Sequence, residues 1–107
     1  MNEIQDGSGN VFEDLGFASE EAAELKIKSD LAFVINRIIK HRHLTQSEAK
    51  ELLGATQADV SRLANGKIAG FTIERLFRYL RRLDRDFIIT VKKKPNSRSQ
   101  AIAQVRA

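Results

Sequence analysis

The chain has 107 residues, of which 42% are hydrophobic and 30% charged, with a formal net charge of +4 and no cysteine. This length suits one domain with tails and is too short for two domains. Without cysteine, neither a disulfide nor a thiolate zinc site can hold the fold together. No apolar run approaches the ~20 residues that a membrane-spanning helix needs. The acidic start also lacks the features of a signal peptide, so we expect a cytoplasmic protein.

Charge is distributed unevenly along the chain. Residues 1–25 hold seven acidic side chains and no Lys or Arg, so the rest of the chain carries all 18 basic residues. Such asymmetry suggests that the two ends have different partners. The basic body suits a polyanion such as DNA, because Lys and Arg release counterions when they neutralise phosphates. The acidic N-terminus suits either a basic protein partner or solubility alone, and its four apolar residues could form a docking element for such a partner or a local lid on the first long helix: Val11, Phe12, Leu15 and Phe17.

The first element expected is an acidic N-terminal segment over residues 1–18, disordered up to about Asn10. Ser19 is then expected to cap a long helix, whose first turn places acidic side chains at the positive end of the helix dipole. Residues 40–43 end this helix with cations, including two histidines whose spacing does not favour a metal site. The helix belongs to the core, because its apolar residues recur at helical spacing: Ile27, Leu31, Val34 and Ile38, in a stripe widened by Ile35 and Ile39.

Two short helices follow, each opened by a threonine. Thr45 with Glu48, and Thr56 with Asp59, both match the spacing of a capping box. Gly54 between them supplies a left-handed residue that can end the first helix. Helices over residues 46–53 and 57–65, joined by this turn, predict a helix-turn-helix whose second helix fits the DNA major groove. The alternative is a pair of solvated helices in an unrelated all-α domain.

The second of these helices divides into an inner and an outer face. Val60, Leu63 and Ala64 are expected to pack inward, while the outer face is polar and almost free of large apolar groups. We expect Gln57 and Arg62 to read bases, because their forked donors match base edges. Other residues are expected to adjust the fit or to contact the DNA backbone. The full set of predicted DNA-binding residues is Gln46, Thr56, Gln57, Ala58, Ser61, Arg62, Asn65 and Lys67.

A fourth helix is expected to begin after Thr72, which is placed to cap it. Its apolar residues are expected to face inward: Ile73, Leu76, Phe77, Leu80 and Leu83. Its arginines are expected to face outward: Arg75, Arg78, Arg81, Arg82 and Arg85. This basic row could be a DNA-facing stripe, but a solvated basic face is the simpler interpretation.

The pattern then changes to the two-residue period of a β-strand over residues 86–92. A single strand cannot satisfy its own backbone hydrogen bonds, so pairing with the same strand of a second copy would form a two-fold dimer. The alternative is an extended segment packed on the helices. The predicted dimerisation residues are Phe87, Ile88, Ile89, Thr90 and Val91. Residues 93–107 are expected to form a flexible basic tail.

Several of these stretches resemble the XRE, or lambda-repressor-like, helix-turn-helix family: residues 44–46, 53–54, 57, 60–63 and 65–67. Residues 10–17 and 70–76 resemble a narrower branch that contains antitoxins of the HigA type. Lys50 departs from the family, which usually carries a small residue at this close approach of the two helices. The resemblance implies a DNA-binding regulator and, in the narrower branch, a protein that also binds a toxin.

These observations predict an all-α, lambda-repressor-like bundle of four to five helices with a short C-terminal β-strand, and a DNA-binding domain over residues 19–92. We expect a dimeric regulator that binds double-stranded operator DNA, acting as antitoxin and autorepressor beside a small basic ribonuclease toxin. A stand-alone repressor and a pure protein-interaction module are the alternatives. No catalytic motif is present, and no enzyme activity, cofactor or metal is expected.

Overall fold

The computed structural model describes residues 10–93 and 104–106, and within them it contains five helices and no strand. The helices are α1 (Val11–Asp14), α2 (Ser19–His41), α3 (Gln46–Leu53), α4 (Gln57–Ala64) and α5 (Ile73–Arg82). The predicted all-α helical bundle is therefore confirmed. Residues 1–9 and most of the predicted basic tail lie outside the described residues. No helix among the described residues is long and apolar enough to cross a membrane.

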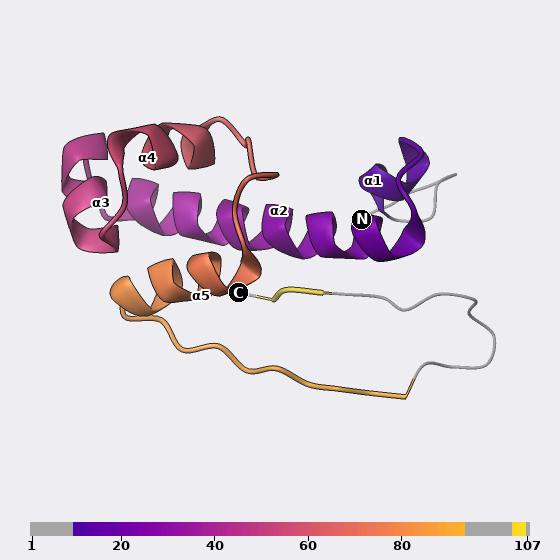
Figure 1. Ribbon diagram of the computed structural model, residues 1–107. Coiled ribbons are helices and arrows are strands. Elements are labelled where there is room, and N and C mark those ends of the chain that lie inside the picture. The colour runs from indigo at the N-terminus through magenta and orange to yellow at the C-terminus, as the bar shows by residue number, and fades with distance from the viewer. Residues whose placement is uncertain (1–9, 94–103, 107) are drawn as a thin grey trace.

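The long helix α2 is the axis of the fold. Figure 1 shows α3, α4 and the C-terminal part of α5 near one end of α2, and α1 at the other end. Ile35 is fully buried at the centre of the core cluster, with Leu31 and Ile38 on the same helix. Ile27 and Val34 are only partly buried against this cluster. The predicted wide stripe therefore faces inward, with Leu31, Ile35 and Ile38 as its buried part.

The start of α2 differs from the prediction. Its N-cap is Ala18, which has no side chain able to cap, and Ser19 is the first helical residue. The Ser19 hydroxyl instead donates to a Glu13 carboxylate oxygen at 3.1 Å, which links α1 to α2. The prediction that Ser19 caps the helix was wrong, because a tertiary contact uses its hydroxyl.

Helix α1 is capped by Asn10, whose side-chain oxygen accepts from the amides of Phe12 and Glu13. The Asn10 amide nitrogen also donates to the Ala22 carbonyl of α2 at 3.0 Å. Phe12 and Phe17 meet edge to face, with ring centroids 6.3 Å apart. These contacts fold residues 10–17 against the N-terminal end of α2, where Ala22 is fully buried.

Helices α3 and α4 form the predicted helix-turn-helix. The Thr45 hydroxyl accepts from the Glu48 amide at 3.0 Å, and the Glu48 carboxylate accepts from the Thr45 amide at 2.8 Å. This reciprocal pair confirms the first capping box. Gly54 ends α3 with φ 66°, in the left-handed region. Thr56 caps α4 by accepting from the Asp59 amide at 3.0 Å.

Lys50 is accommodated at the margin of α3. Its side chain is 40% exposed, and its ammonium lies 3.9 Å from a Glu51 carboxylate oxygen. The buried residues of α3 are Ala49 and Leu53, and the helix lies against both α4 and α5. The lysine stem therefore lies beside the helix contact and keeps its charge in water, and the two helices pack without a small residue at this position.

Helix α5 closes the core by packing against both α2 and α3. Its threonine cap is confirmed, because the Thr72 hydroxyl accepts from the Arg75 amide at 3.1 Å. Leu76, Leu80 and Leu83 are buried as predicted, whereas Ile73 and Phe77 are only partly buried. Tyr79 is also buried, at 3% exposure, which the apolar pattern did not predict.

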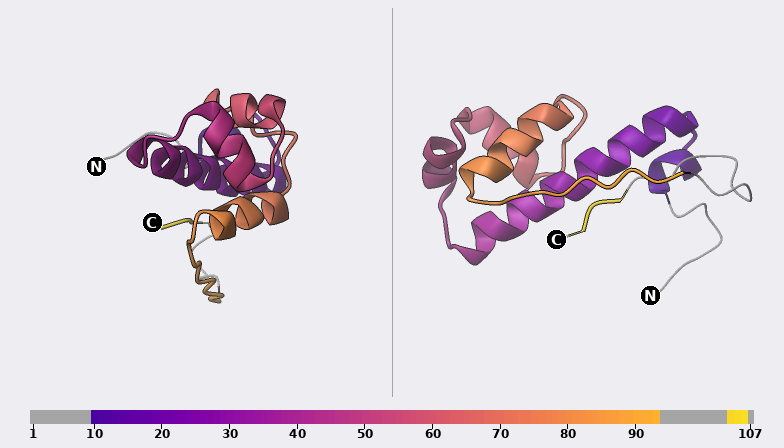
Figure 2. Two further views of the ribbon diagram at one scale, coloured as in Figure 1. Left: turned by 90° about the vertical axis from the view of Figure 1, so that its left-hand side faces the viewer. Right: turned by 90° about the horizontal axis from the view of Figure 1, so that it is seen from below.

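The expected strand after α5 is not formed in the part of the chain that the structure describes. Residues 86–93 continue from α5 as extended chain without an assigned strand (Figures 1 and 2). Phe87 stacks on Phe77 of α5, with ring centroids 4.3 Å apart, while Ile88 and Val91 are each 91% exposed. A strand is defined by backbone hydrogen bonds to a neighbouring strand, and no described segment pairs with this one.

Candidate nucleic-acid interface

The outer face of α4 is accessible along its whole length. Among the predicted base-contacting residues, only Ser61 is half-buried; the others are exposed: Thr56, Gln57, Ala58 and Arg62. The inner face is formed by the buried Val60 and Leu63. Ala64, which was expected to face inward, is exposed, because α4 ends there and turns toward Gly66. A short helix anchored by two apolar residues with a polar opposite face has the form of a major-groove reader.

The N-terminal ends of α3 and α4 are joined through two glutamines. The Gln57 amide nitrogen donates to the Gln46 side-chain oxygen at 2.9 Å, and both residues are exposed. A glutamine amide has two N–H donors and an oxygen acceptor. After this hydrogen bond, Gln57 retains one donor and its oxygen, the pair needed to bridge adenine N7 and N6. The Gln46 contact restrains Gln57 in one orientation.

Asn65 and Lys67 lie just beyond the end of α4, and both are exposed. The Asn65 amide nitrogen donates to the Ser61 carbonyl at 2.9 Å, which holds the side chain against its own helix. Lys67 follows Gly66, whose φ of 71° ends the helix with a sharp change of direction. The structure thus places all eight predicted DNA-binding residues on α4 or beside its two ends.

A buried carboxylate on α4 was not recognised from the sequence. Asp59 is 8% exposed and contacts two arginines. One of its oxygens accepts from Arg62 of the same helix, and the other accepts from Arg75 of α5 at 2.5 Å. Asp59 was expected to complete a second capping box. Its carboxylate is used for these ion pairs instead, so only the Thr56 half of that box is present.

Arg75 was expected to face outward and instead lies between α4 and α5, with its side chain 30% exposed. Its Nε and Nη2 atoms donate to the Tyr79 hydroxyl at 3.3 and 3.2 Å. Its guanidinium carbon lies 4.7 Å from the centroid of the buried Phe71 ring. The hydrogen bond to Tyr79, with the nearby Asp59 carboxylate, raises the pKa of Arg75 despite partial desolvation.

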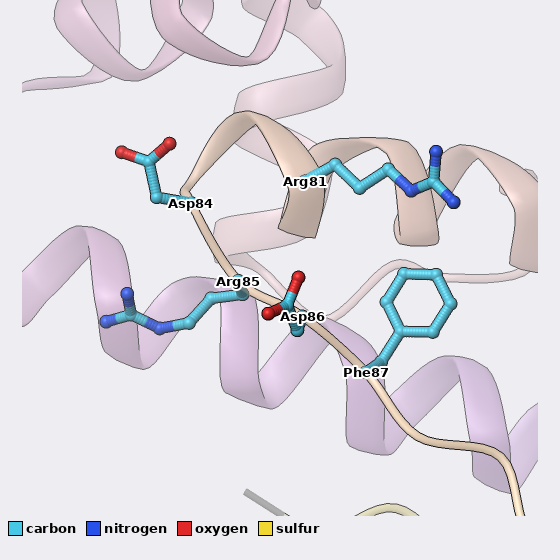
Figure 3. Close-up of a pocket in the computed structure, with 5 residues that line it drawn as sticks. All are labelled: Arg81, Asp84, Arg85, Asp86 and Phe87. Carbon is cyan, nitrogen blue, oxygen red and sulfur yellow. The ribbon is translucent and has the colours of Figure 1, made fainter.

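The other arginines of α5 are exposed, as predicted. The Arg82 guanidinium reaches back to the turn between α3 and α4, where it lies 3.5 Å from the position that a Cβ atom on Gly54 would take. Arg81 extends toward Phe87, with its guanidinium carbon 5.6 Å from the ring centroid. Figure 3 shows Arg81 and Phe87 beside an open hollow that is also lined by Asp84, Arg85 and Asp86.

The capped pair α3 and α4, with the polar face of α4 uncovered, defines a DNA-binding protein of the helix-turn-helix class. A family described as "Helix-turn-helix domain" matches residues 11–92, most of the chain. A solved structure named "Putative XRE Family Transcriptional Regulator" is 41% identical, with a TM-score of 0.75, over 81% of this chain and 98% of the other. No match was found among curated proteins.

The chain therefore belongs to the XRE family of helix-turn-helix proteins. Fold and family together make it a DNA-binding transcriptional regulator.

Proposed function

We propose that this regulator binds its operator as a homodimer, with α4 of each copy in the major groove, and represses its own transcription. The hydrogen bond between Gln46 and Gln57 is the observation that supports operator reading by α4, because it presents one forked amide at the exposed start of that helix. Helix-turn-helix proteins read bases with the first residues of the second helix. Gln57 occupies the first position of α4.

In this arrangement Gln57 reads adenine and Arg62 reads guanine, with Thr56, Ala58 and Ser61 adjusting the fit to neighbouring bases. Each bidentate contact contributes ~1–3 kcal/mol of discrimination against a wrong base. Gln46, Asn65 and Lys67 hold the DNA backbone, because they flank the two ends of the reading helix. These side chains fix position without reading sequence.

Replacing Gln57 by alanine tests this assignment. Gln57→Ala should lower operator affinity about 5- to 150-fold while leaving binding to random duplex nearly unchanged. Gln104→Ala is the matched control, because Gln104 is an exposed glutamine outside the helix-turn-helix, and its loss should change neither affinity. Titrations on both duplexes at one salt concentration give the comparison. An equal loss on operator and random DNA would rule out base reading by Gln57.

The extended segment after α5 supports dimerisation. Phe77 holds Phe87 by stacking, while Ile88, Ile89 and Val91 expose 91%, 68% and 91% of their surfaces. Apolar side chains on extended backbone that pairs with no other described segment are suited to pairing with the same segment of a second copy. Two copies would read half-sites ~34–36 Å apart, the usual spacing for such dimers.

We further propose that the regulator is the antitoxin of a toxin–antitoxin pair, whose toxin is a small basic ribonuclease. Around α1 the exposed apolar residues are Val11, Leu15 and Phe17, and the adjoining turns of α1 and α2 are acidic. A surface that combines exposed apolar and acidic side chains is complementary to a basic protein.

Co-purification with the product of the neighbouring reading frame tests the toxin proposal. Tagged protein should retain that product, and Leu15→Lys, which reverses the character of the α1 surface, should release it. Phe33→Lys is a control, because Phe33 is also exposed but lies at mid-length of α2. Operator binding without any retained product would favour the alternative of a stand-alone repressor.

A further inference from the structure

Asp59 occupies an unusual place for a carboxylate in a DNA-reading helix. It is the third residue of α4 and nearly buried, although α4 is the helix proposed to enter the DNA groove. Two guanidinium groups compensate its charge, one from Arg62 and one from Arg75. The cluster of three side chains therefore carries a net positive charge, and the carboxylate does not repel phosphates as a free acid would.

The inner side of this cluster is fixed by the core. Arg75 is held by the Tyr79 hydroxyl and lies over the buried Phe71 ring. It cannot follow Asp59 outward without losing both contacts. The Asp59 carboxylate therefore has a fixed position at the junction of α4 and α5, unlike an exposed acid paired with arginine three residues along a helix, whose pairing is weak.

The outer side of the cluster is Arg62, whose side chain is 51% exposed. Its Nη2 atom donates to Asp59, and its guanidinium carbon lies 6.0 Å from the Phe71 centroid. A guanidinium has five N–H donors, so this contact leaves enough donors for the two acceptors of a guanine edge. The same contact limits the rotamers that Arg62 can sample.

We propose that Asp59 is a positioning residue for sequence readout: it holds Arg62 in the orientation that contacts guanine, and Arg75 holds Asp59. This proposal rests on the proposed base-reading role of Arg62. Fixing a long side chain before binding removes an ordering cost that association otherwise includes. The expected gain in affinity is roughly 2- to 10-fold, the factor that corresponds to one immobilised side chain.

The test compares Asp59→Asn, Arg62→Ala and the double variant on the operator and on a set of duplexes with each base pair replaced in turn. Asp59→Asn should lower operator affinity roughly 2- to 10-fold. It should also reduce discrimination at the same base pair as Arg62→Ala does. In the Arg62→Ala background, Asp59→Asn should have no further effect, because the side chain that it positions is absent.

Tyr79→Phe is the structural control. It removes the hydroxyl that holds Arg75 but leaves the Phe71 contact of Arg75 and the contact between Asp59 and Arg62, so it should lower thermal stability and reduce discrimination less than Asp59→Asn does, at the same base pair. If Asp59→Asn does not fold, Arg75→Lys is the alternative test, because lysine keeps a positive charge beside Asp59 but lacks the paired donors of a guanidinium. It should cause a smaller loss at the same base pair, and unchanged discrimination there would overturn the proposal.

Two results separate this proposal from the one on which it rests. Full selectivity in Arg62→Ala would overturn the base-reading role of Arg62, and the positioning role with it. Full selectivity in Asp59→Asn, with selectivity lost in Arg62→Ala, would overturn only the positioning role. An undiminished effect of Asp59→Asn in the Arg62→Ala background would assign Asp59 a purely structural role.

Discussion

Gly54 determines how α3 leads into α4, and its replacement by alanine gives a sharp test of the turn. Its φ of 66° lies in the left-handed region, where an L-residue with a Cβ costs about 1–2 kcal/mol. A Cβ at this position would meet the Arg82 guanidinium at 3.5 Å, an ordinary contact with the end of a flexible side chain. The cost is therefore backbone strain alone, and we expect Gly54→Ala to lose about 1–2 kcal/mol of unfolding free energy.

Urea unfolding followed by circular dichroism measures this loss. The urea midpoint should fall, while the slope of the unfolding free energy against urea concentration stays unchanged, because unfolding exposes the same surface in both proteins. In thermal unfolding, each 1 kcal/mol of lost unfolding free energy should lower Tm by roughly 4–8 °C for a domain of this size. Gly54→Asn should lose less, because asparagine tolerates the left-handed region better than alanine.

Gly70→Ala is the matched control for this prediction. Gly70 lies outside the left-handed region, and a Cβ built there meets nothing within 4 Å. The substitution should leave stability unchanged or raise it by up to about 1 kcal/mol, because alanine restricts the unfolded chain. If Gly54→Ala and Gly70→Ala had the same unfolding free energy, the left-handed turn would not be required by the fold.

Three further substitutions test the cap, the backbone contact and the dimer. Thr45→Ala removes the acceptor of the capping box and should cost about 1 kcal/mol, measured by urea unfolding; no loss would mean that water replaces the cap. Lys67→Ala should weaken binding to all duplexes alike and reduce the slope of log affinity against log salt concentration by about one unit. Titrations of operator and random duplex over a range of salt concentrations measure both effects, and a loss on the operator alone would contradict the prediction. Ile89→Pro removes a strand donor and should give monomers in sedimentation, with helices intact by circular dichroism; a helical dimer would place the interface elsewhere.

The helix-turn-helix could be predicted in detail because its signals are local. A threonine hydroxyl that caps the third residue of its own helix, and a glycine in a left-handed turn, depend on a few neighbouring residues only. Thr45, Gly54 and Thr56 therefore behave in the structure as their spacing predicts. The inward positions of Val60 and Leu63 follow from the helical period in the same way.

Contacts between distant residues could not be predicted in this way. The spacing of Thr56 and Asp59 fits a capping box, but it does not include Arg75, 16 residues further along the chain. The helical period placed Arg75 outward with the other arginines, although Asp59 and Tyr79 draw it inward. The sequence signal that could have indicated a polar contact there is the tyrosine four residues after Arg75, because a tyrosine that packs on the core usually needs a partner for its hydroxyl.

The segment after α5, which was predicted to be a strand, shows a different limit. Alternation over residues 86–92 identifies extended backbone, and the chain there is extended. Alternation does not identify the partner, because ladder hydrogen bonds join two segments and the pattern describes only one. Phe87 is held on Phe77 and the following apolar residues are exposed, so the alternation also occurs in a segment that the described part of the domain does not cover.

The length of α2 separates the two proposed binding surfaces. At a rise of about 1.5 Å per residue, its 23 residues span roughly 35 Å, with α1 at one end and the helix-turn-helix at the other (Figure 1). A basic protein bound at α1 would therefore leave the outer face of α4 uncovered. Charge also differs along the fold, because acidic residues dominate the first turns of α1 and α2, while arginines cover α5.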